Sequence, residues 1–375
     1  MDGSLLSGNL FSNFLILSWQ DVVMITLGLV LIYLAIVKEY EPVLLLPIGF
    51  GCVLANLGMA ASSDGDGFLS VLYRAGIESE LFPLMIFIGV GGMIDFSPLL
   101  SQPHLALLGA AGQFGIYGTL VIATLLGFNL NEAASIGVIG AIDGPTAIFV
   151  AGKLAPHMLA PIAVAAYSYM SLIPIIQPPV MKLLTTRKER LIRMEYAPRQ
   201  VSKKALIIFP IMVTVIISIL APDAAPLIAA LMLGNLLKES GVVERLNHSA
   251  QNEIINMSTL FLGLTIGATM TAESFLQIDT LLILALGLFA FVLDTIAGLL
   301  FGKLMTVISG GKINPLIGAC GISAFPMAGR LSAKMAQDED FENFILMHAM
   351  GSNTAGQLGS VIAGGLLLSL VLNLQ

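Results

Sequence analysis

The fold of this chain is decided by one glycine-broken stretch, Gly137-Val138-Ile139-Gly140-Ala141-Ile142-Asp143-Gly144-Pro145-Thr146-Ala147. It places a carboxylate where a lipid-spanning helix would be expected. A charged group at bilayer depth costs about 2.5–3.5 kcal/mol on insertion scales, so such residues usually face a protein-lined cavity and carry ions or protons. Gly144 and Pro145 should break the helix beside Asp143, because proline removes a backbone donor and glycine tolerates unusual conformations. The carbonyl groups freed by such a break can bind a cation.

The composition around this stretch is that of a membrane protein. Of the 375 residues, 57% are hydrophobic and 11% are charged, with a mean hydropathy of +0.92, whereas soluble proteins carry about 25% charged residues. We expect an all-α polytopic membrane protein with about eleven transmembrane helices and no nucleic-acid partner. Twelve apolar segments, some of which can be re-entrant hairpins, support this number: 20–37, 43–59, 81–100, 104–128, 131–154, 159–181, 205–222, 224–241, 254–275, 280–306, 315–336 and 343–373.

A basic loop marks the middle of the chain. Eight of the 17 Lys and Arg residues fall between Lys182 and Lys204, and the positive-inside rule places this basic loop, 182–204, in the cytoplasm. It is either a topology signal alone or also a docking surface for an acidic partner or anionic lipid. We expect an N-terminal half (1–184), a basic cytoplasmic loop (185–204) and a C-terminal half (205–375). The start, Met1-Asp2-Gly3-Ser4, lacks a positive region, so no cleaved signal peptide is expected.

The two halves carry an internal repeat. The strings FIGVG (87–91) and FLGLT (261–265) resemble each other, the Gly-Pro-Lys spacing of 140–153 matches that of 321–334, and Gln177 falls opposite Gln357. Repeats whose glycine- and proline-interrupted segments correspond are a pointer to a transporter binding site. We expect two structural repeats and favour an inverted arrangement. Whether they are inverted depends on whether an odd or even number of spans separates them, which the apolar segments leave open. A two-fold axis would bring both breaks to the midplane, with Asp143 facing Ser323.

The second half adds polar groups without a matching acid. Asn314 opens the broken segment, Ser323 and Arg330 follow it, and the last apolar segment carries hydroxyl and carboxamide oxygens within 348–357. Hard cations prefer oxygen ligands, which suits sodium. The alternative is that these residues join helices by hydrogen bonds. Their clustering at the matched breaks favours ion binding.

Longer strings then carry a family resemblance: PIGFG (47–51), IDGPTA (142–147), KLAP (153–156), AVAAYSYM (163–170), IQPP (176–179), ESGVVERL (239–246), NPLIG (314–318) and HAMG (348–351). Together they cover nearly the whole chain. They resemble the beta subunit of sodium-pumping, biotin-dependent decarboxylases. The resemblance implies an integral membrane subunit that decarboxylates carboxybiotin and couples this reaction to sodium export.

The resemblance also implies the site residues, motif by motif. Asp143 matches the family's essential acid and Tyr169 its essential tyrosine. The catalytic residues implied are Asp143, Tyr169 and Arg330, with Arg330 also binding the carboxybiotin. The sodium ligands implied are Asp143, Asn314, Ser323 and Asn353, with Gly318 as a backbone contact. This chain departs from the usual family pattern at Ile142 and before Asn353. At these two places the resemblance therefore supports sodium ligands from side chains better than sodium ligands from backbone carbonyls.

The chemistry of carboxybiotin fits these assignments. Loss of carbon dioxide leaves an anionic ureido nitrogen that must take up a proton, so Tyr169 is a candidate donor or relay. Arg330 is a candidate anchor for the carboxylate. Competition between a proton and sodium for Asp143 is the simplest coupling.

The resemblance names partners and a location. It implies a soluble carboxyltransferase (alpha subunit), a biotin carrier subunit that supplies carboxybiotin, a small single-span subunit and the bacterial cell membrane, and it is compatible with a homotrimer of this chain. The short form between segments two and three resembles the acyl-CoA types, with a slight preference for glutaconyl-CoA over methylmalonyl-CoA. The rival class is a sodium/proton antiporter or sodium-coupled carboxylate transporter, which the physics of the sequence alone does not exclude. A purely structural membrane anchor fits poorly with a buried Asp143.

Overall fold

Long apolar runs form helices in this chain, because a helix satisfies its own backbone groups where no water is at hand. The computed structural model describes residues 17–39, 41–61, 65–195 and 200–374, and these ranges contain no strand. The expectation about the first four residues lies outside them. Six helical segments in the described ranges are long and apolar enough to cross a membrane: Trp19–Val37, Pro42–Met59, Leu105–Leu125, Lys203–Leu220, Ile278–Ile308 and Leu346–Asn373.

Two further segments are apolar but bent. Phe68–Glu78 meets Leu81–Met93 at 58°, and Pro156–Met170 meets Leu172–Leu184 at 63°, so the described ranges hold up to eight spans. The protein is therefore an all-α membrane protein. These segments are six to eight of the about eleven expected, because glycines and prolines divide other apolar segments, such as 131–154, into pieces shorter than a bilayer is thick.

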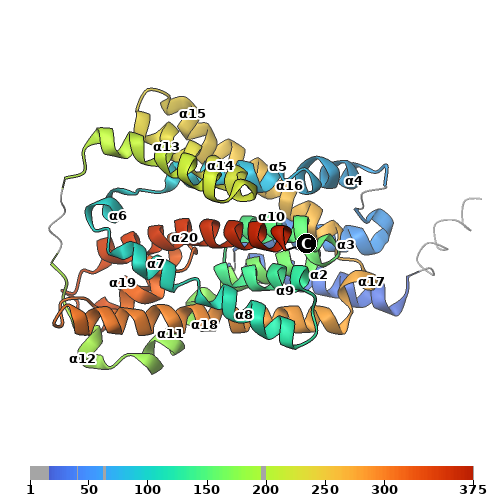
Figure 1. Cartoon of the computed structure of the whole chain (residues 1–375). Helices are drawn as coiled ribbons and strands as arrows, with labels where there is room; N and C mark the ends of the chain where they lie inside the picture. The colour runs from blue at the N-terminus through green and yellow to red at the C-terminus, as the bar shows by residue number, and fades with distance from the viewer. Residues whose placement is uncertain (1–16, 40, 62–64, 196–199, 375) are drawn as a thin grey trace, which may run out of the picture.

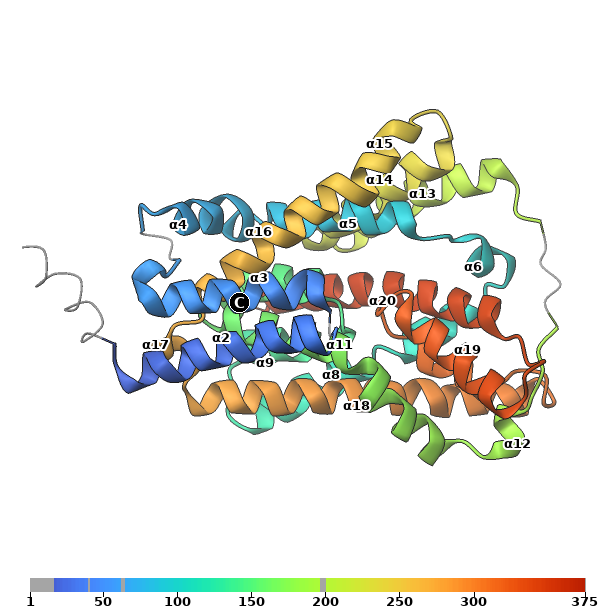
Figure 2. The ribbon, with the colours of Figure 1, turned by 180° about the vertical axis from the view of Figure 1, so that it is seen from behind.

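Six helices that pack against one another form one group, here called the outer group. They are α2 (Trp19–Val37), α3 (Pro42–Leu54), α5 (Leu81–Met93), α13 (Lys203–Leu220), α14 (Ala225–Ser240) and α16 (Ile255–Ala268). In Figures 1 and 2, α5, α13, α14 and α16 lie along the upper edge, with α3 and then α2 below them. In this group α3 packs against α2 and α16, and α14 packs against α5 and α13. Exposed apolar side chains such as Val215 and Ile219 of α13 fit a lipid-facing surface.

Glycines bring two helix pairs of the outer group into backbone contact. The pairs are α3 with α16 and α5 with α14. At each of four glycines a β-carbon would clash with a carbonyl oxygen of the partner helix: Gly51 with Leu264, Gly267 with Ile48, Gly91 with Leu231, and Gly234 with Ile88. Small residues at helix interfaces allow such close approach in membranes. In each pair, therefore, both helices contribute a glycine that faces the backbone of the partner helix.

A second group, here called the broken group, surrounds the long helices α18 and α20 and includes several short helical pieces (Figure 1). It consists of α7 (Leu105–Ala111), α8 (Phe114–Leu125), α9 (Leu130–Gly137), η3 (Val138–Ala141), α10 (Gly144–Leu154), α11 (Leu159–Leu184), α18 (Ile278–Ile308), η7 (Pro315–Cys320), α19 (Met327–Glu339) and α20 (Leu346–Asn373). The helix α18 packs against α8, α11 and η7, while α20 packs against α7 and α19.

Short elements connect these helices. They are η1 (Ala55–Met59), α4 (Phe68–Leu72), η2 (Tyr73–Glu78), α6 (Ser97–Ser101), η4 (Pro156–Met158), α12 (Arg187–Arg190), η5 (Pro222–Ala224), α15 (Glu244–Ser249), η6 (Ala250–Ile254) and α17 (Ala272–Phe275).

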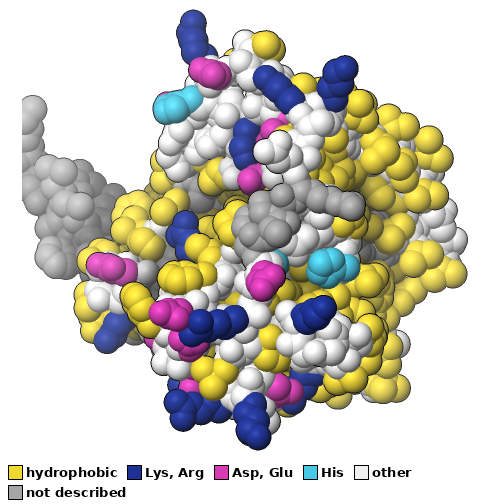
Figure 3. Space-filling model, turned by 90° about the vertical axis from the view of Figure 1, so that its left-hand side faces the viewer, with side chains coloured by type: hydrophobic (Ala, Val, Ile, Leu, Met, Phe, Trp, Pro, Cys, Tyr) yellow, Lys and Arg dark blue, Asp and Glu magenta, His cyan; other side chains and the backbone are white. Residues whose placement is uncertain are grey.

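The basic loop is bound to the end of α19. Arg190 lies 2.7 Å from Glu339, and Arg193 lies 2.7 Å from Asp340. Figure 3 shows this end of the molecule, where charged side chains gather between apolar flanks. The hydrogen bond from Arg190 holds the pKa of Glu339 below its ordinary value. Part of the loop's positive charge is thus neutralised within the chain, which leaves less of it for an acidic partner.

Candidate functional site

Asp143 lies at the break between η3 and α10. Ile142 adopts a left-handed conformation with φ of 52°, and Asp143 occupies the N-cap position of α10 without a capping hydrogen bond from its side chain. Asp143 is 6% exposed, and its Oδ2 accepts hydrogen bonds from three side chains: Thr146 Oγ1 at 2.8 Å, Gln357 Nε2 at 3.0 Å and Ser360 Oγ at 3.3 Å. Uncharged donors thus hold the carboxylate in place, and it forms no ion pair with any described side chain.

The second break meets the first. Ser323 is 3% exposed, and both its backbone N–H and its hydroxyl donate to the carbonyl oxygen of Ala141. Ala141 is the last residue of η3, two positions before Asp143. Two residues after Ser323, the peptide bond between Phe325 and Pro326 is cis. The structure therefore brings Asp143 and Ser323 together, where the alignment of the two breaks placed them.

A cavity of about 300 Å³ opens beside these two residues, between the outer group and the broken group. Tyr167 and Met170 of α11 lie on one side of it, and Ile86 and Val90 of α5 on the other. Besides Tyr167, seven of its lining side chains carry oxygen atoms: Glu41, Asp143, Gln251, Asn256, Thr259, Ser323 and Gln357. Such a set of carboxylate, hydroxyl and amide oxygens suits a hard cation.

Asn353 supports the second break from α20. Its Nδ2 donates to Ile322 O at 2.8 Å and Cys320 O at 3.3 Å, while its Oδ1 accepts from the N–H of Gly329 at 3.4 Å. The side chain is fully buried and does not line the cavity. Asn353 therefore shapes the turn that carries Ser323.

Asn314 and Gly318 lie away from the cavity. Asn314 Nδ2 donates to the carbonyl oxygens of Arg190 at 3.0 Å and Ile192 at 2.9 Å, so this residue binds the basic loop to the start of η7. Gly318 makes room for α18, because a β-carbon there would clash with the carbonyl oxygen of Gly298. The sequence grouped both residues with Asp143, and the structure does not bring them together with it.

The tyrosine that faces Asp143 is Tyr167. Its ring packs against Gly144, and it lines the cavity. Tyr169, the residue implied by the motif, instead donates its hydroxyl to the carbonyl oxygen of Leu284 in α18. Tyr169 is 8% exposed and does not line the cavity.

Arg330 lies on the exposed face of α19, together with Lys334 one turn later. It takes part in no ion pair within the described residues, and it does not line the Asp143 cavity. The predicted carboxylate anchor is thus at the surface of the chain, separate from the cation cavity.

Of the three side chains that donate to Asp143, Gln357 belongs to the polar stretch 348–357 that the sequence associates with ion binding, whereas no sequence pattern assigned a role to Thr146 or Ser360. The signal was available in the spacing of Asn353, Gln357 and Ser360, because positions i, i+4 and i+7 share one helix face.

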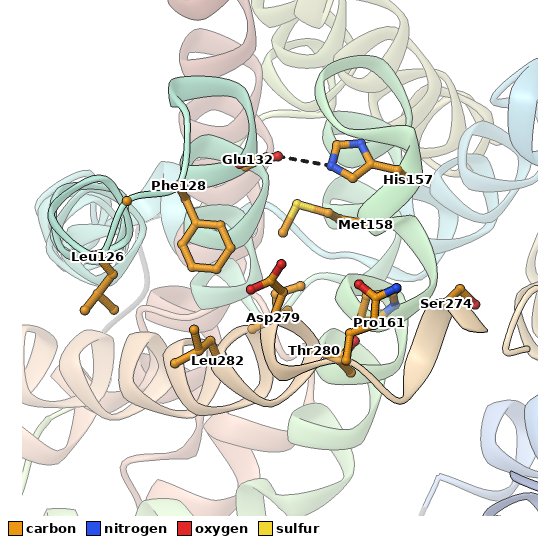
Figure 4. Close-up of a pocket in the computed structure, with 13 residues that line it drawn as sticks. Leu126, Phe128, Glu132, His157, Met158, Pro161, Ser274, Asp279, Thr280 and Leu282 are labelled. Atoms are coloured by element: carbon orange, nitrogen blue, oxygen red, sulfur yellow. Dashed lines mark hydrogen bonds and ion pairs between the residues drawn. The ribbon is translucent and has the colours of Figure 1, made fainter. Parts of the chain in front are cut away.

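A second cavity, of about 230 Å³, lies where α8 ends and α18 begins (Figure 4). An ion pair of 3.1 Å joins Glu132 to His157 at its edge, and Asp279 and Thr280 line it. The far end of α18 contacts the basic loop through Lys303 and Glu189, 3.2 Å apart. This polar cavity is therefore at the opposite end of the molecule from the basic loop.

Comparison with known proteins identifies the family. A sequence profile described as the Na+-transporting oxaloacetate decarboxylase beta subunit matches residues 20–371. The chain belongs to this family. It is 52% identical over 362 residues to the methylmalonyl-CoA decarboxylase subunit beta of Veillonella parvula, covering 96% of both chains. It is 51% identical over 360 residues to the glutaconyl-CoA decarboxylase subunit beta of Acidaminococcus fermentans, again covering 96% of both. The oxaloacetate decarboxylase beta chain of Klebsiella pneumoniae is 46% identical over 413 residues, with 94% of this chain and 95% of that one covered.

Proposed function

We propose that this chain is the membrane subunit of a Na+-transporting, biotin-dependent decarboxylase, which removes carbon dioxide from carboxybiotin and exports sodium. The observation that carries the proposal is the buried carboxylate of Asp143, bonded only to uncharged donors and facing an oxygen-lined cavity. A carboxylate in that setting gains most from a small cation, because burial of an unpaired charge is costly. Each charge moved outward against the membrane potential costs about 2.3 kcal/mol per 100 mV, and decarboxylation supplies this free energy.

The sodium site is centred on Asp143 and Ser323. Asp143 supplies the charge, Ser323 supplies a hydroxyl oxygen, and Gln357 contributes its amide oxygen to the same cavity. Asn353 is proposed to act at the second break, as a further ligand when the break rearranges. Asn314 and Gly318 are proposed to hold the segment that carries Ser323, which their contacts with the basic loop and α18 support.

Carboxybiotin is proposed to bind at the end of the molecule that carries the basic loop. Arg330 and Lys334 offer exposed positive charge there for its carboxylate. Cleavage of the carbon–nitrogen bond leaves the electron pair on the ureido nitrogen, which takes up a proton. Tyr169 is proposed to relay that proton from the opposite side of the membrane, because it contacts α18 at Leu284, far along the helix from the Lys303 end that meets the basic loop. Release of sodium from Asp143 is proposed to accompany the step.

The repeat proposal is of two inverted halves, 1–184 and 205–375, separated by the basic loop 185–204 and containing about eleven transmembrane helices. Support comes from the glycine contacts: α3 and α5 of the first half would correspond to α14 and α16 of the second, with Gly51 equivalent to Gly234 and Gly91 to Gly267. The alignment of 87–91 with 261–265 instead pairs Gly91 with Thr265, so the two registers differ by two residues. We place the basic loop in the cytoplasm of a bacterial cell, with the cavity at the start of α18 outside.

The holoenzyme is proposed to contain a soluble carboxyltransferase, a biotin carrier subunit and a small single-span subunit, around one or three copies of this chain. The acyl substrate is proposed to be a CoA thioester. The identities of 52% and 51% to the two acyl-CoA types give no preference between methylmalonyl-CoA and glutaconyl-CoA. Such similar identities are expected, because the membrane subunit binds carboxybiotin and not the acyl substrate.

The test is purification of the chain from its native membrane, followed by an avidin blot and reconstitution into vesicles. We expect a biotinylated protein to copurify and sodium uptake to require carboxybiotin. Sodium movement driven by a pH gradient alone, with no biotinylated partner, would instead establish the antiporter.

A further inference from the structure

A second carboxylate lies deep in the broken group. Asp294 stands near the middle of α18, and it is the sole ionisable side chain between Asp279 and Lys303. Its side chain is 0% exposed. A lone acid in a long apolar helix is a functional candidate for the same reason as Asp143. No glycine–proline break stands beside it, so the pattern that singles out Asp143 in the sequence does not include Asp294.

The two oxygens of Asp294 have different surroundings. Oδ1 accepts a hydrogen bond from the backbone N–H of Gly115 in α8. Oδ2 is buried and has no hydrogen-bond partner among the described residues. Glycines make the space for this group: a β-carbon on Gly140 would stand 3.0 Å from Oδ2, and one on Gly115 2.6 Å from Oδ1.

These surroundings favour a proton over a metal ion. An ionised carboxylate with one hydrogen bond and no counter-charge is costly to bury, whereas the neutral acid is not. Sodium would need several oxygen ligands. Gly140, which lies next to Oδ2, has no side chain to supply one. A proton on Oδ2 removes the charge without any further ligand.

Asp294 is also placed to respond to the break at Asp143. It contacts Gly140, which belongs to η3 and precedes Asp143 by three residues. The preceding residue, Ile139, and the ring of Tyr169 both pack at Gly287 of α18. Gly287 and Asp294 are seven residues apart, so they share one helix face with a rise of about 10 Å between them. Tyr169, η3 and Asp294 thus lie along one stripe of α18.

We propose that Asp294 is a proton-binding site of the pump, separate from the sodium site at Asp143, that exchanges its proton when η3 moves. This rests on the proposed function. The carboxylate takes up one proton through the stripe that contains Tyr169 to become a carboxylic acid, and later releases it toward the end of α18 that contacts the basic loop. The proton ends on the ureido nitrogen, which holds the electron pair left by the departing carbon dioxide. Sodium at Asp143 and the proton then need not share one group.

The first test is infrared spectroscopy of the purified chain at neutral pH. We expect Asp294→Asn to remove a carbonyl-stretch band of a neutral carboxyl group. Thr295→Val is the matched control, since Thr295 is equally buried and donates only to Phe291 of its own helix. It should leave the band in place. An unchanged band in Asp294→Asn means that the group carries no proton, and the proposal is then wrong. This readout does not depend on transport or catalysis.

The second test measures proton and sodium movement in vesicles that contain the holoenzyme, during turnover. In Asp294→Asn we expect the proton-to-sodium ratio to fall at least about twofold, because one binding place of the proton is gone. A ratio equal to that of the wild type contradicts the proposal, and in an inactive variant the infrared result decides. Absence of carboxybiotin-driven sodium uptake in the wild type refutes the proposed function instead and leaves the infrared result standing.

Discussion

The charge of Asp143 can be tested apart from its position. Asp143→Asn keeps the shape of the side chain and removes the charge, while Thr146→Val keeps the charge and removes the 2.8 Å hydrogen bond to Oδ2. A unit charge about 4 Å from a cation, at an effective dielectric constant of about 20, is worth roughly 4 kcal/mol. At 1.36 kcal/mol per factor of ten, this corresponds to about a 10³-fold loss in sodium affinity. A hydrogen bond to a charged group is worth about 1.5–3 kcal/mol, or roughly 10- to 100-fold.

The assay is decarboxylation of carboxybiotin by the reconstituted holoenzyme as sodium is varied, with uptake of labelled sodium measured in parallel. Asp143→Asn should abolish both at ordinary sodium concentrations and leave assembly intact by gel filtration. Thr146→Val should retain the maximal rate at a higher sodium requirement. Wild-type sodium dependence in Asp143→Asn, or equal losses in the two variants, would refute the assignment of the charge to cation binding.

Three residues and the basic loop give further predictions. Ser323→Ala should raise the sodium concentration for half-maximal activity more than it lowers the maximal rate, and an unchanged dependence would leave Ser323 a packing role. Tyr169→Phe should slow decarboxylation and change its profile between about pH 5 and 9, whereas a wild-type profile would remove it from proton delivery. Gly234→Ala should prevent stable assembly, while Gly152→Ala, where a β-carbon meets open space, should assemble normally by gel filtration. The depressed pKa of Glu339 stabilises the attached loop above the ordinary carboxyl pKa. Hydrogen exchange in 187–195 should therefore quicken as pH falls below about 4, and constant exchange would contradict the attachment.

The break at Asp143 and its meeting with Ser323 were predictable, because glycine and proline after a buried acid leave the backbone few alternatives. The choice between Tyr167 and Tyr169 was not. Residues two apart on a helix point in nearly opposite directions, so the choice depends on the rotation of α11. Nothing in the apolar sequence determines that rotation.

The distance of Asn314 from the cavity was not predicted, because it depends on the length of η7. It is followed by the six residues of η7, and a 3₁₀ helix rises about 2 Å per residue. Asn314 is therefore carried about 12 Å from the end of η7 that leads to Ser323. A motif places residues close in sequence, whereas an extended helical turn places them far apart in space.

The four glycines of the outer group, Gly51, Gly91, Gly234 and Gly267, have a consequence for evolutionary comparison. Each is held by the nearness of a neighbouring backbone, so no larger residue fits without moving a whole helix. They should therefore be invariant among relatives even where the pumped ion or the acyl substrate changes. Strict invariance at these positions would reflect geometry alone, and ranking residues by constancy would place them beside Asp143 although they perform no chemistry.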